Sequence, residues 1–190
     1  MGIFRISDTG ESFTRVAASG QPCLRETLNA GFDIVLGMNA AHSGMKGSSI
    51  ATYGLSGCIA GYIDNPKTHT LFHYAIEEGC HEGAISEALH GRVGDKTACV
   101  HFFVPGIWAP EADGRWGIKP EARYLADFLK PSLEFLNTRS VESRIHGYAL
   151  EPHGDTRYQG TVWVDRAGDL FCEGMPVAGL AALNRLQPKP

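Results

Sequence analysis

Cys58 and His73 stand fifteen residues apart, on either side of a turn-forming segment, and could form a nucleophile–base pair. The flanks of this segment are rich in β-branched and aromatic residues, and Asp64-Asn-Pro-Lys67 has turn chemistry, so the stretch predicts a β-hairpin. A midpoint at Asn65-Pro66 places the thiol and the imidazole directly opposite each other, with Cβ atoms about 4.5–5.5 Å apart. An imidazole at that distance can activate a thiol by taking its proton.

Residues just before the cysteine could complete such a site. Thr52 precedes Cys58 by six residues, and its hydroxyl or main-chain carbonyl is a candidate to orient the imidazole. Gly57 permits a bulge, which would free nearby N–H groups to stabilise an oxyanion, and Ser56 belongs to the same backbone support. The alternative is a buried cysteine without chemistry, because cysteine is among the most buried residue types and a one-residue slip would separate the pair.

The stretch Leu55-Ser-Gly-Cys58 with a following His73 resembles the Leu-x-Gly-Cys signature of the cysteine glutamine deamidases. This group includes the bacterial chemoreceptor deamidases, the catalytic domain of the cytotoxic necrotizing factors and Burkholderia lethal factor. Both spacings, from Thr52 to Cys58 and from Cys58 to His73, are similar to those of the lethal factor, and the match covers residues 50–74. The resemblance implies an α/β (α+β) fold, with a β-sandwich-like core of mixed sheets flanked by helices.

The same resemblance implies a reaction and roles. Cys58 would be the nucleophile, His73 the acid/base and Thr52 the orienting group in the conversion of a protein glutamine to glutamate, with no metal or cofactor. A bacterial toxin acting on the RNA helicase of eukaryotic translation initiation is the first expectation. A Rho-type GTPase or a bacterial receptor as substrate, transglutamination, amide or peptide hydrolysis by the same pair, and a non-enzymatic binding domain all stay open.

Composition limits the class of protein. The 190 residues are 43% hydrophobic and 20% charged, which predicts one globular domain over residues 1–190. The net charge of −4 argues against a direct nucleic-acid binder, and there is no apolar run long enough for a membrane span. Without a signal-peptide pattern at the N-terminus, we expect a cytoplasmic protein or one delivered into a host cytosol by another route. Five irregularly spaced cysteines indicate reduced thiols.

Hydrophobic periodicity and turn residues predict the remaining elements. Strands are expected over residues 3–6, 32–36, 98–104, 140–150 and 158–165, the last entering a hairpin that turns at 166–168. Helices are expected over residues 82–90, 120–136 with a break at Pro131, and 177–186, and a loop over 107–120.

Further polar residues are candidates for the site or for a metal. The glycine-rich segment 37–49 predicts a loop beside the site, with His42 and Ser43 as substrate contacts, and His153 is a third candidate in a later turn. His69 and His73 have metal-ligand spacing on a helix, but on a strand they stand about 13 Å apart, which argues against one shared metal ion. His101, within an apolar strand, is expected to be a core histidine with its hydrogen bonding satisfied.

Overall fold

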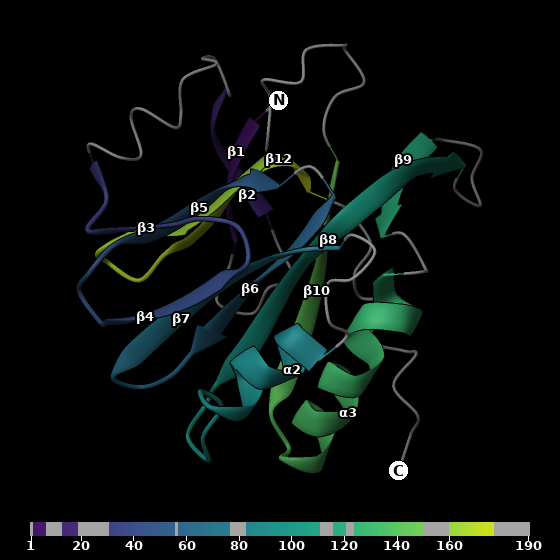
Figure 1. The fold of residues 1–190 in the computed structure, drawn as a ribbon. Coiled ribbons are helices and arrows are strands. Elements are labelled where there is room, and N and C mark those ends of the chain that lie inside the picture. The colour runs from purple at the N-terminus through teal and green to yellow at the C-terminus, as the bar shows by residue number, and fades with distance from the viewer. Residues whose placement is uncertain are drawn as a thin grey trace.

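The fold is mixed α+β, as the sequence predicts, in a computed structural model that describes residues 2–6, 13–18, 31–55, 57–76, 83–110, 116–120, 124–149 and 160–176 (Figure 1). The strands are β1 (Gly2–Ile6), β2 (Phe13–Ala18), β3 (Ile34–Leu36), β4 (Ala40–Met45), β5 (Ile50–Leu55), β6 (Cys58–Asp64), β7 (Thr68–Ala75), β8 (Cys99–Pro110), β9 (Trp116–Pro120), β10 (Glu142–Ala149), β11 (Gly160–Val164) and β12 (Leu170–Pro176). The helices are α2 (Gly83–His90), the π-helix η1 (Tyr124–Leu129) and α3 (Lys130–Thr138).

The strands form one hydrogen-bonded network folded into two layers. Its path runs β3-β5-β11-β12-β10-β8-β6-β7-β4, with β1 attached to β12, β2 attached to β1, and β9 attached to β8. The pairs β3–β5 and β8–β10 are parallel, and the others are antiparallel. The path crosses between layers where only the end of β12 pairs with the end of β10. A mixed sheet folded on itself in this way gives a β-sandwich-like core.

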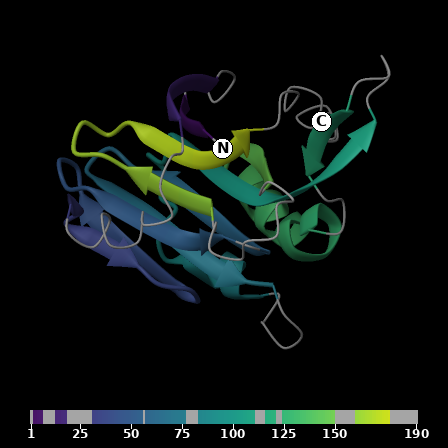
Figure 2. The ribbon, with the colours of Figure 1, turned by 90° about the horizontal axis from the view of Figure 1, so that it is seen from above.

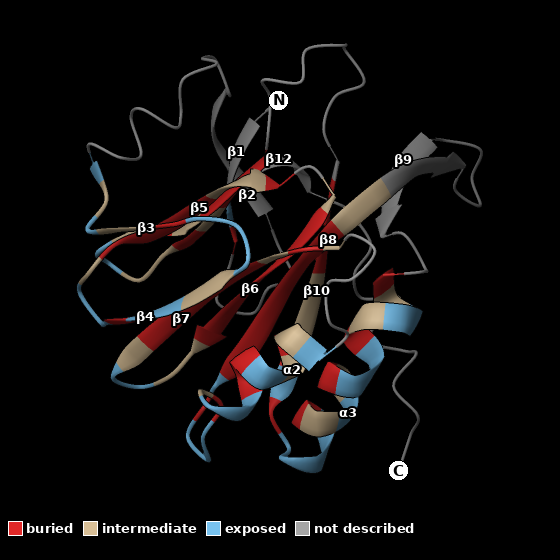
Figure 3. Cartoon of the chain, viewed as in Figure 1, coloured by how far each residue is buried: buried red, intermediate tan, exposed pale blue. Residues whose placement is uncertain are grey.

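Two apolar clusters lie on opposite faces of the β6–β7–β8 layer. Between the two strand layers, Val162 of β11 belongs to the same buried cluster as Phe103 of β8. On the other face, Phe102 belongs to a cluster with Leu89 of α2 and Leu136 of α3. Both helices lie together on one side of the strands (Figure 2), and the central strands are buried along their length (Figure 3). Among the described residues, no helix has the length and hydropathy needed to span a membrane.

The β6–β7 hairpin forms, but its register differs by two residues from the predicted one. Cys58 is opposite Ala75, and His73 is opposite Ala60, because the N–H of Asn65 bonds to the carbonyl of Thr68 and centres the turn one residue later. Proline favours the second position of such a turn and is disfavoured at the third, where the predicted midpoint would have put it. Because the shift is even, Cys58 and His73 still face the same side of the sheet.

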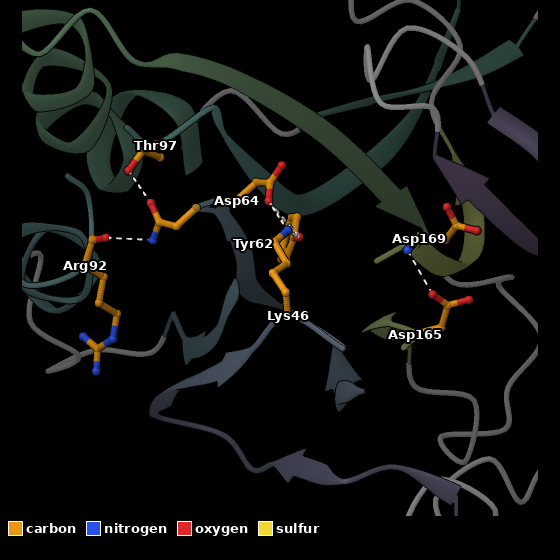
Figure 4. Close-up of polar contacts among 8 residues, drawn as sticks. Lys46, Tyr62, Asp64, Arg92, Thr97, Asp165 and Asp169 are labelled. Carbon is orange, nitrogen blue, oxygen red and sulfur yellow. Dashed lines mark hydrogen bonds and ion pairs between the residues drawn. The ribbon is translucent and has the colours of Figure 1, made fainter. Parts of the chain in front are cut away.

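Contacts at the turn end hold this register (Figure 4). The Asn65 side chain donates to the carbonyl of Arg92 and accepts from the hydroxyl of Thr97, so the turn is tied to the segment between α2 and β8. Lys46, just after β4, forms an ion pair with Asp64 at the end of β6. These contacts hold β4, the β6–β7 turn and the segment before β8 together at the end of the hairpin opposite Cys58.

Two expected loops contain strands. Segment 37–49 includes β4, which pairs with β7, so the prediction of a loop there was wrong over Ala40–Met45. Segment 107–120 contains the end of β8 and all of β9, so β8 does not stop at Pro105-Gly106. Glycine and proline content misled both predictions, because strands at the margin of a sheet tolerate these residues better than central strands.

The helical predictions were correct for α2 and incomplete after β9. Residues 116–120 are a strand, and the helical segment begins at Tyr124 as a π-helix before continuing as α3. Pro131 lies in the first turn of α3, where its missing N–H costs little, so it marks the change from π- to α-helix. The expected hairpin with a turn at 166–168 is confirmed, with Gly168 at φ 92°. The expected helix over 177–186 lies outside the described residues.

Candidate active site

A pocket of about 500 Å³ opens at the start of β6, at the end of the hairpin away from its turn, and both Cys58 and His73 line it. Met38, Gly57 and Tyr124 contribute to its walls. Cys58 is the first residue of β6. His73 lies on the inner face of β7, diagonal to Cys58 across the strand pair. Diagonal neighbours of this kind have Cα atoms about 7–8 Å apart, so the two side chains can approach over the pocket floor.

Thr52 of β5 orients the imidazole from the opposite strand layer. Its hydroxyl donates to the carbonyl of Leu36 at 3.1 Å, and its Oγ1 lies 2.8 Å from Nδ1 of His73. Because the single hydroxyl proton is directed to Leu36, Oγ1 accepts from an Nδ1–H, and this sets the tautomer of His73. The contact predicted from the sequence is therefore present, with the side-chain hydroxyl rather than the main-chain carbonyl of Thr52 as acceptor.

The other ring nitrogen of His73 is available for proton transfer. Nε2 makes no hydrogen bond to any described residue, and in this tautomer it carries a lone pair. His73 is 1% exposed, and burial lowers its pKa from 6.5 to about 4. At neutral pH the imidazole is therefore uncharged, as a general base must be before it takes a proton.

Cys58 is a buried cysteine outside any disulfide, and its thiol contacts a methionine. Its Sγ donates weakly to Sδ of Met38 at 4.0 Å. Because Nε2 of His73 accepts no hydrogen bond, the thiol and the imidazole are not hydrogen-bonded to each other in this arrangement. Catalytic hydrogen bonds often tighten only when substrate is bound, so this geometry is compatible with a nucleophile–base pair.

The backbone N–H groups expected to hold an oxyanion are engaged by a tyrosine. The hydroxyl of Tyr148, on β10, accepts from the N–H of Gly57 at 3.2 Å and from that of Cys58 at 3.1 Å. It also donates to the carbonyl of Cys58 at 2.8 Å. The prediction that these N–H groups lie free was therefore wrong, because a distant strand brings a hydroxyl into the same space. Ser56 lies outside the described residues.

The backbone geometry before Cys58 favours glycine. Gly57 has φ 150°, a conformation that residues with a Cβ rarely adopt, although no atom would contact an added Cβ. Its carbonyl accepts a hydrogen bond from the hydroxyl of Tyr124 at 3.3 Å. The turn into β6 is thus held by one tyrosine on each side, from η1 and from β10.

The proposed substrate contacts do not gather at the pocket. His42 and Ser43 are exposed residues of β4, and neither lines the pocket; Ser43 instead bonds to Thr70 through their hydroxyls at 2.7 Å. From the same segment, Gly37 and Met38 line the pocket. His153 lies outside the described residues.

Three further histidines, His69, His101 and His146, lie in the core. His69 and His73 share one face of strand β7, and the described residues contain no group of three or more His, Cys, Asp or Glu that could hold a metal ion. Nδ1 of His101 lies 2.9 Å from Nε2 of His146, so the expectation of a hydrogen-bonded core histidine is confirmed. Neither feature adds a ligand to the pocket.

Sequence reasoning missed Met38, Tyr124 and Tyr148. Met38 lies in the segment 37–49 that is predicted to border the site, but the substrate contacts predicted there are the polar residues His42 and Ser43. Tyr124 falls within the predicted helix over 120–136, and Tyr148 within the predicted strand over 140–150. Nothing local marks either hydroxyl as one that bonds to backbone 67 or 90 residues away. No protein-family model matches the chain, and no curated protein sequence matches it.

Proposed function

We propose that this protein is a cysteine-dependent protein glutamine deamidase. The observation that carries the proposal is the Thr52–His73 contact, which directs Nδ1 of the imidazole away from the pocket that Cys58 also lines. A nucleophile, a base and a group that orients the base are the three parts that covalent amide chemistry requires. The resemblance over residues 50–74 to the deamidase signature gives the amide of glutamine as the substrate group.

The mechanism follows from the positions of these residues. His73 takes the thiol proton at Nε2, and the thiolate of Cys58 attacks the side-chain carboxamide carbon of a glutamine. His73 then gives this proton to the departing ammonia, leaving a thioester. Water attacks the thioester, its proton passes to Nε2, and the carboxylate of glutamate leaves as the thiol is restored. The target residue gains one negative charge.

The proposed substrate is a protein that carries the target glutamine. The helicase of eukaryotic translation initiation and a Rho-type GTPase are the first candidates to test, and a bacterial chemoreceptor is the third. If a primary amine replaces water in the last step, the same thioester gives transglutamination.

Peptide mass spectrometry of a eukaryotic cytosolic extract tests the proposal. Treated extract should contain a glutamate in place of one specific glutamine, and extract treated with Cys58→Ser should not. Cys172→Ser, at a buried cysteine outside both the pocket and any disulfide, should retain the activity and serves as the matched control. An added primary amine that becomes joined to the target glutamine would instead identify a transglutaminase. Absence of any Cys58-dependent change, in this extract and in a bacterial one, would contradict the proposal.

A further inference from the structure

Met38 is an exposed methionine whose sulfur reaches the candidate nucleophile. It is 55% exposed, it lies in the link between β3 and β4, and it lines the pocket. Its Sδ is 4.0 Å from Sγ of Cys58. Met45 is the other exposed large apolar side chain of the described residues, and it lies at the far end of β4, outside the pocket. Core packing therefore does not account for the position of Met38.

A glutamine side chain can occupy the same path as the side chain of Met38. Methionine and glutamine each have two methylene groups after Cα, and the next atom is Sδ in one and the carboxamide carbon in the other. A glutamine side chain in the place of Met38 would therefore bring the carbon that is attacked close to Sγ of Cys58. Reacting atoms in a productive complex are about 3–3.5 Å apart, so only a small adjustment separates the two geometries.

We propose that Met38 occupies, in the substrate-free chain, the subsite of the glutamine side chain that Cys58 attacks. The identity of the ligand, a glutamine side chain of another protein, rests on the deamidase function proposed above. An unbranched, half-exposed methionine can leave by rotating its side chain, because it gives up little buried surface. The backbone need not move, since the adjacent Asn39 accepts a hydrogen bond from the N–H of Ala75 at 3.0 Å and holds the chain against β7.

The contact between Met38 and Cys58 also keeps the thiol from the imidazole of His73. The thiol proton of Cys58 is directed to Met38, while Nε2 of His73 is without a hydrogen bond in the described part of the chain. When a glutamine displaces the methionine, the S–H group loses this acceptor and can turn to the imidazole. Binding of the substrate side chain therefore also allows His73 to activate the thiol.

Alkylation tests the covering role of Met38 independently of any deamidase activity. In Met38→Ala, Cys58 should react with iodoacetamide several times faster than in the wild-type chain, because the thiol loses its cover. Met45→Ala is the matched control and should leave the rate unchanged. Equal alkylation rates in Met38→Ala and wild type, with both chains folded, would overturn the proposal.

A second substitution tests the subsite itself. In Met38→Gln, Cys58 should attack the new side chain, release ammonia and, after hydrolysis, leave glutamate at position 38. Combined with Cys58→Ser, the same substitution should retain glutamine there, and Met45→Gln should also retain it. Met38→Glu provides the reference mass and retention time for the peptide.

The outcomes separate the subsite from the function. If position 38 stays glutamine in a folded Met38→Gln chain whose wild-type form deamidates other proteins, the subsite assignment is wrong. If neither position 38 nor any external protein is deamidated, the deamidase function fails and glutamine is withdrawn as the ligand. In that case the alkylation rates still decide whether Met38 covers the thiol.

Discussion

Thr52 and His73 come from facing strand layers, and the 2.8 Å contact between Oγ1 and Nδ1 joins them within the buried core. The hydroxyl of Thr52 is itself fixed by the carbonyl of Leu36 at 3.1 Å. Because both ends of this relay are held by strands, the imidazole has one tautomer and one orientation, with Nε2 left for proton transfer. The sandwich therefore does more than bury apolar residues, since its two layers together fix the orientation of the His73 imidazole.

Replacing Thr52 with valine tests this relay. Valine keeps the shape of threonine and removes the oxygen, so Nδ1 of His73 loses its acceptor and the ring loses its preferred tautomer. We expect the rate of deamidation to fall about a hundredfold, toward the lower end of what a positioned acid–base group contributes. Thr52→Ser keeps the oxygen and should retain most of the activity. Equal rates in Thr52→Val and wild type, at equal folded fractions, would show that the contact has no role in catalysis.

Buried histidines make the stability of the fold depend on pH. Burial lowers the pKa of His73 and of His101 from 6.5 to about 4, and it also lowers the pKa of His69 and of His146. Between pH 6.5 and 4 the unfolded chain therefore binds more protons than the folded chain, and stability rises with pH. We expect the free energy of unfolding, measured in urea, to be greatest above pH 6.5 and to fall as the pH is lowered toward 4.

His69→Leu provides a control for this prediction. His69 is fully buried, and neither ring nitrogen has a hydrogen bond to a described residue, so leucine removes a titrating group without breaking such a bond. The variant should lose part of the pH dependence and keep the fold. A urea midpoint that stays constant from pH 7 to 5 in the wild-type chain would refute the account of the buried histidines.

Tyr148→Phe should weaken the turn that carries the nucleophile. The change leaves three backbone groups, the N–H of Gly57 and both the N–H and the carbonyl of Cys58, without the hydroxyl that bonds to them. Buried unsatisfied groups are costly, so we expect a loss of about 2–4 kcal/mol in the free energy of unfolding, with reduced activity in the chains that remain folded. Chemical denaturation measures the first and peptide deamidation the second.

Tyr124→Phe is the matched comparison, because that hydroxyl donates at 3.3 Å to the carbonyl of Gly57 in the same turn. Its effect on stability should be smaller than that of Tyr148→Phe. If the two variants lose the same free energy of unfolding, the triple contact of Tyr148 is not what stabilises the turn.

Gly57→Ala should be destabilising through backbone strain and not through crowding. The φ of 150° disfavours a residue with a Cβ, while no atom lies within 4 Å of the added methyl group. We expect a loss of about 1–3 kcal/mol in the free energy of unfolding. Gly91→Ala, also at an open position, should change stability by less than about 0.5 kcal/mol. Similar unfolding curves for the two variants would rule out strain at Gly57.

The sequence predicted what depends on local pattern. The β6–β7 hairpin, helix α2 and the turn before β12 follow from alternating apolar residues and from Asn, Pro and Gly at turns. The two-residue error in register came from placing Pro66 third in its turn, where proline is disfavoured, and the preference of proline for the second position would have corrected it. Because the error was even, the shared face of Cys58 and His73 survived it.

The parts of the site that the sequence did not reveal depend on distant segments. Tyr148 reaches Cys58 because the end of β10, where it pairs with β12, lies near the start of β6. Met38 reaches the same thiol because β4 pairs with β7 and sets the preceding link over the pocket. No periodicity in the sequence encodes which strands become neighbours across a fold, so these contacts required the structure.

The most direct test of the central claim is to trap the thioester. A glutamine-containing peptide that the protein deamidates would be mixed with the chain, quenched in acid and analysed by mass spectrometry. We expect Cys58 to carry the peptide as a thioester with ammonia lost, hydroxylamine to release it, and Cys58→Ser to form no such adduct. Deamidation that continues in Cys58→Ser, or an adduct on another cysteine, would contradict this claim.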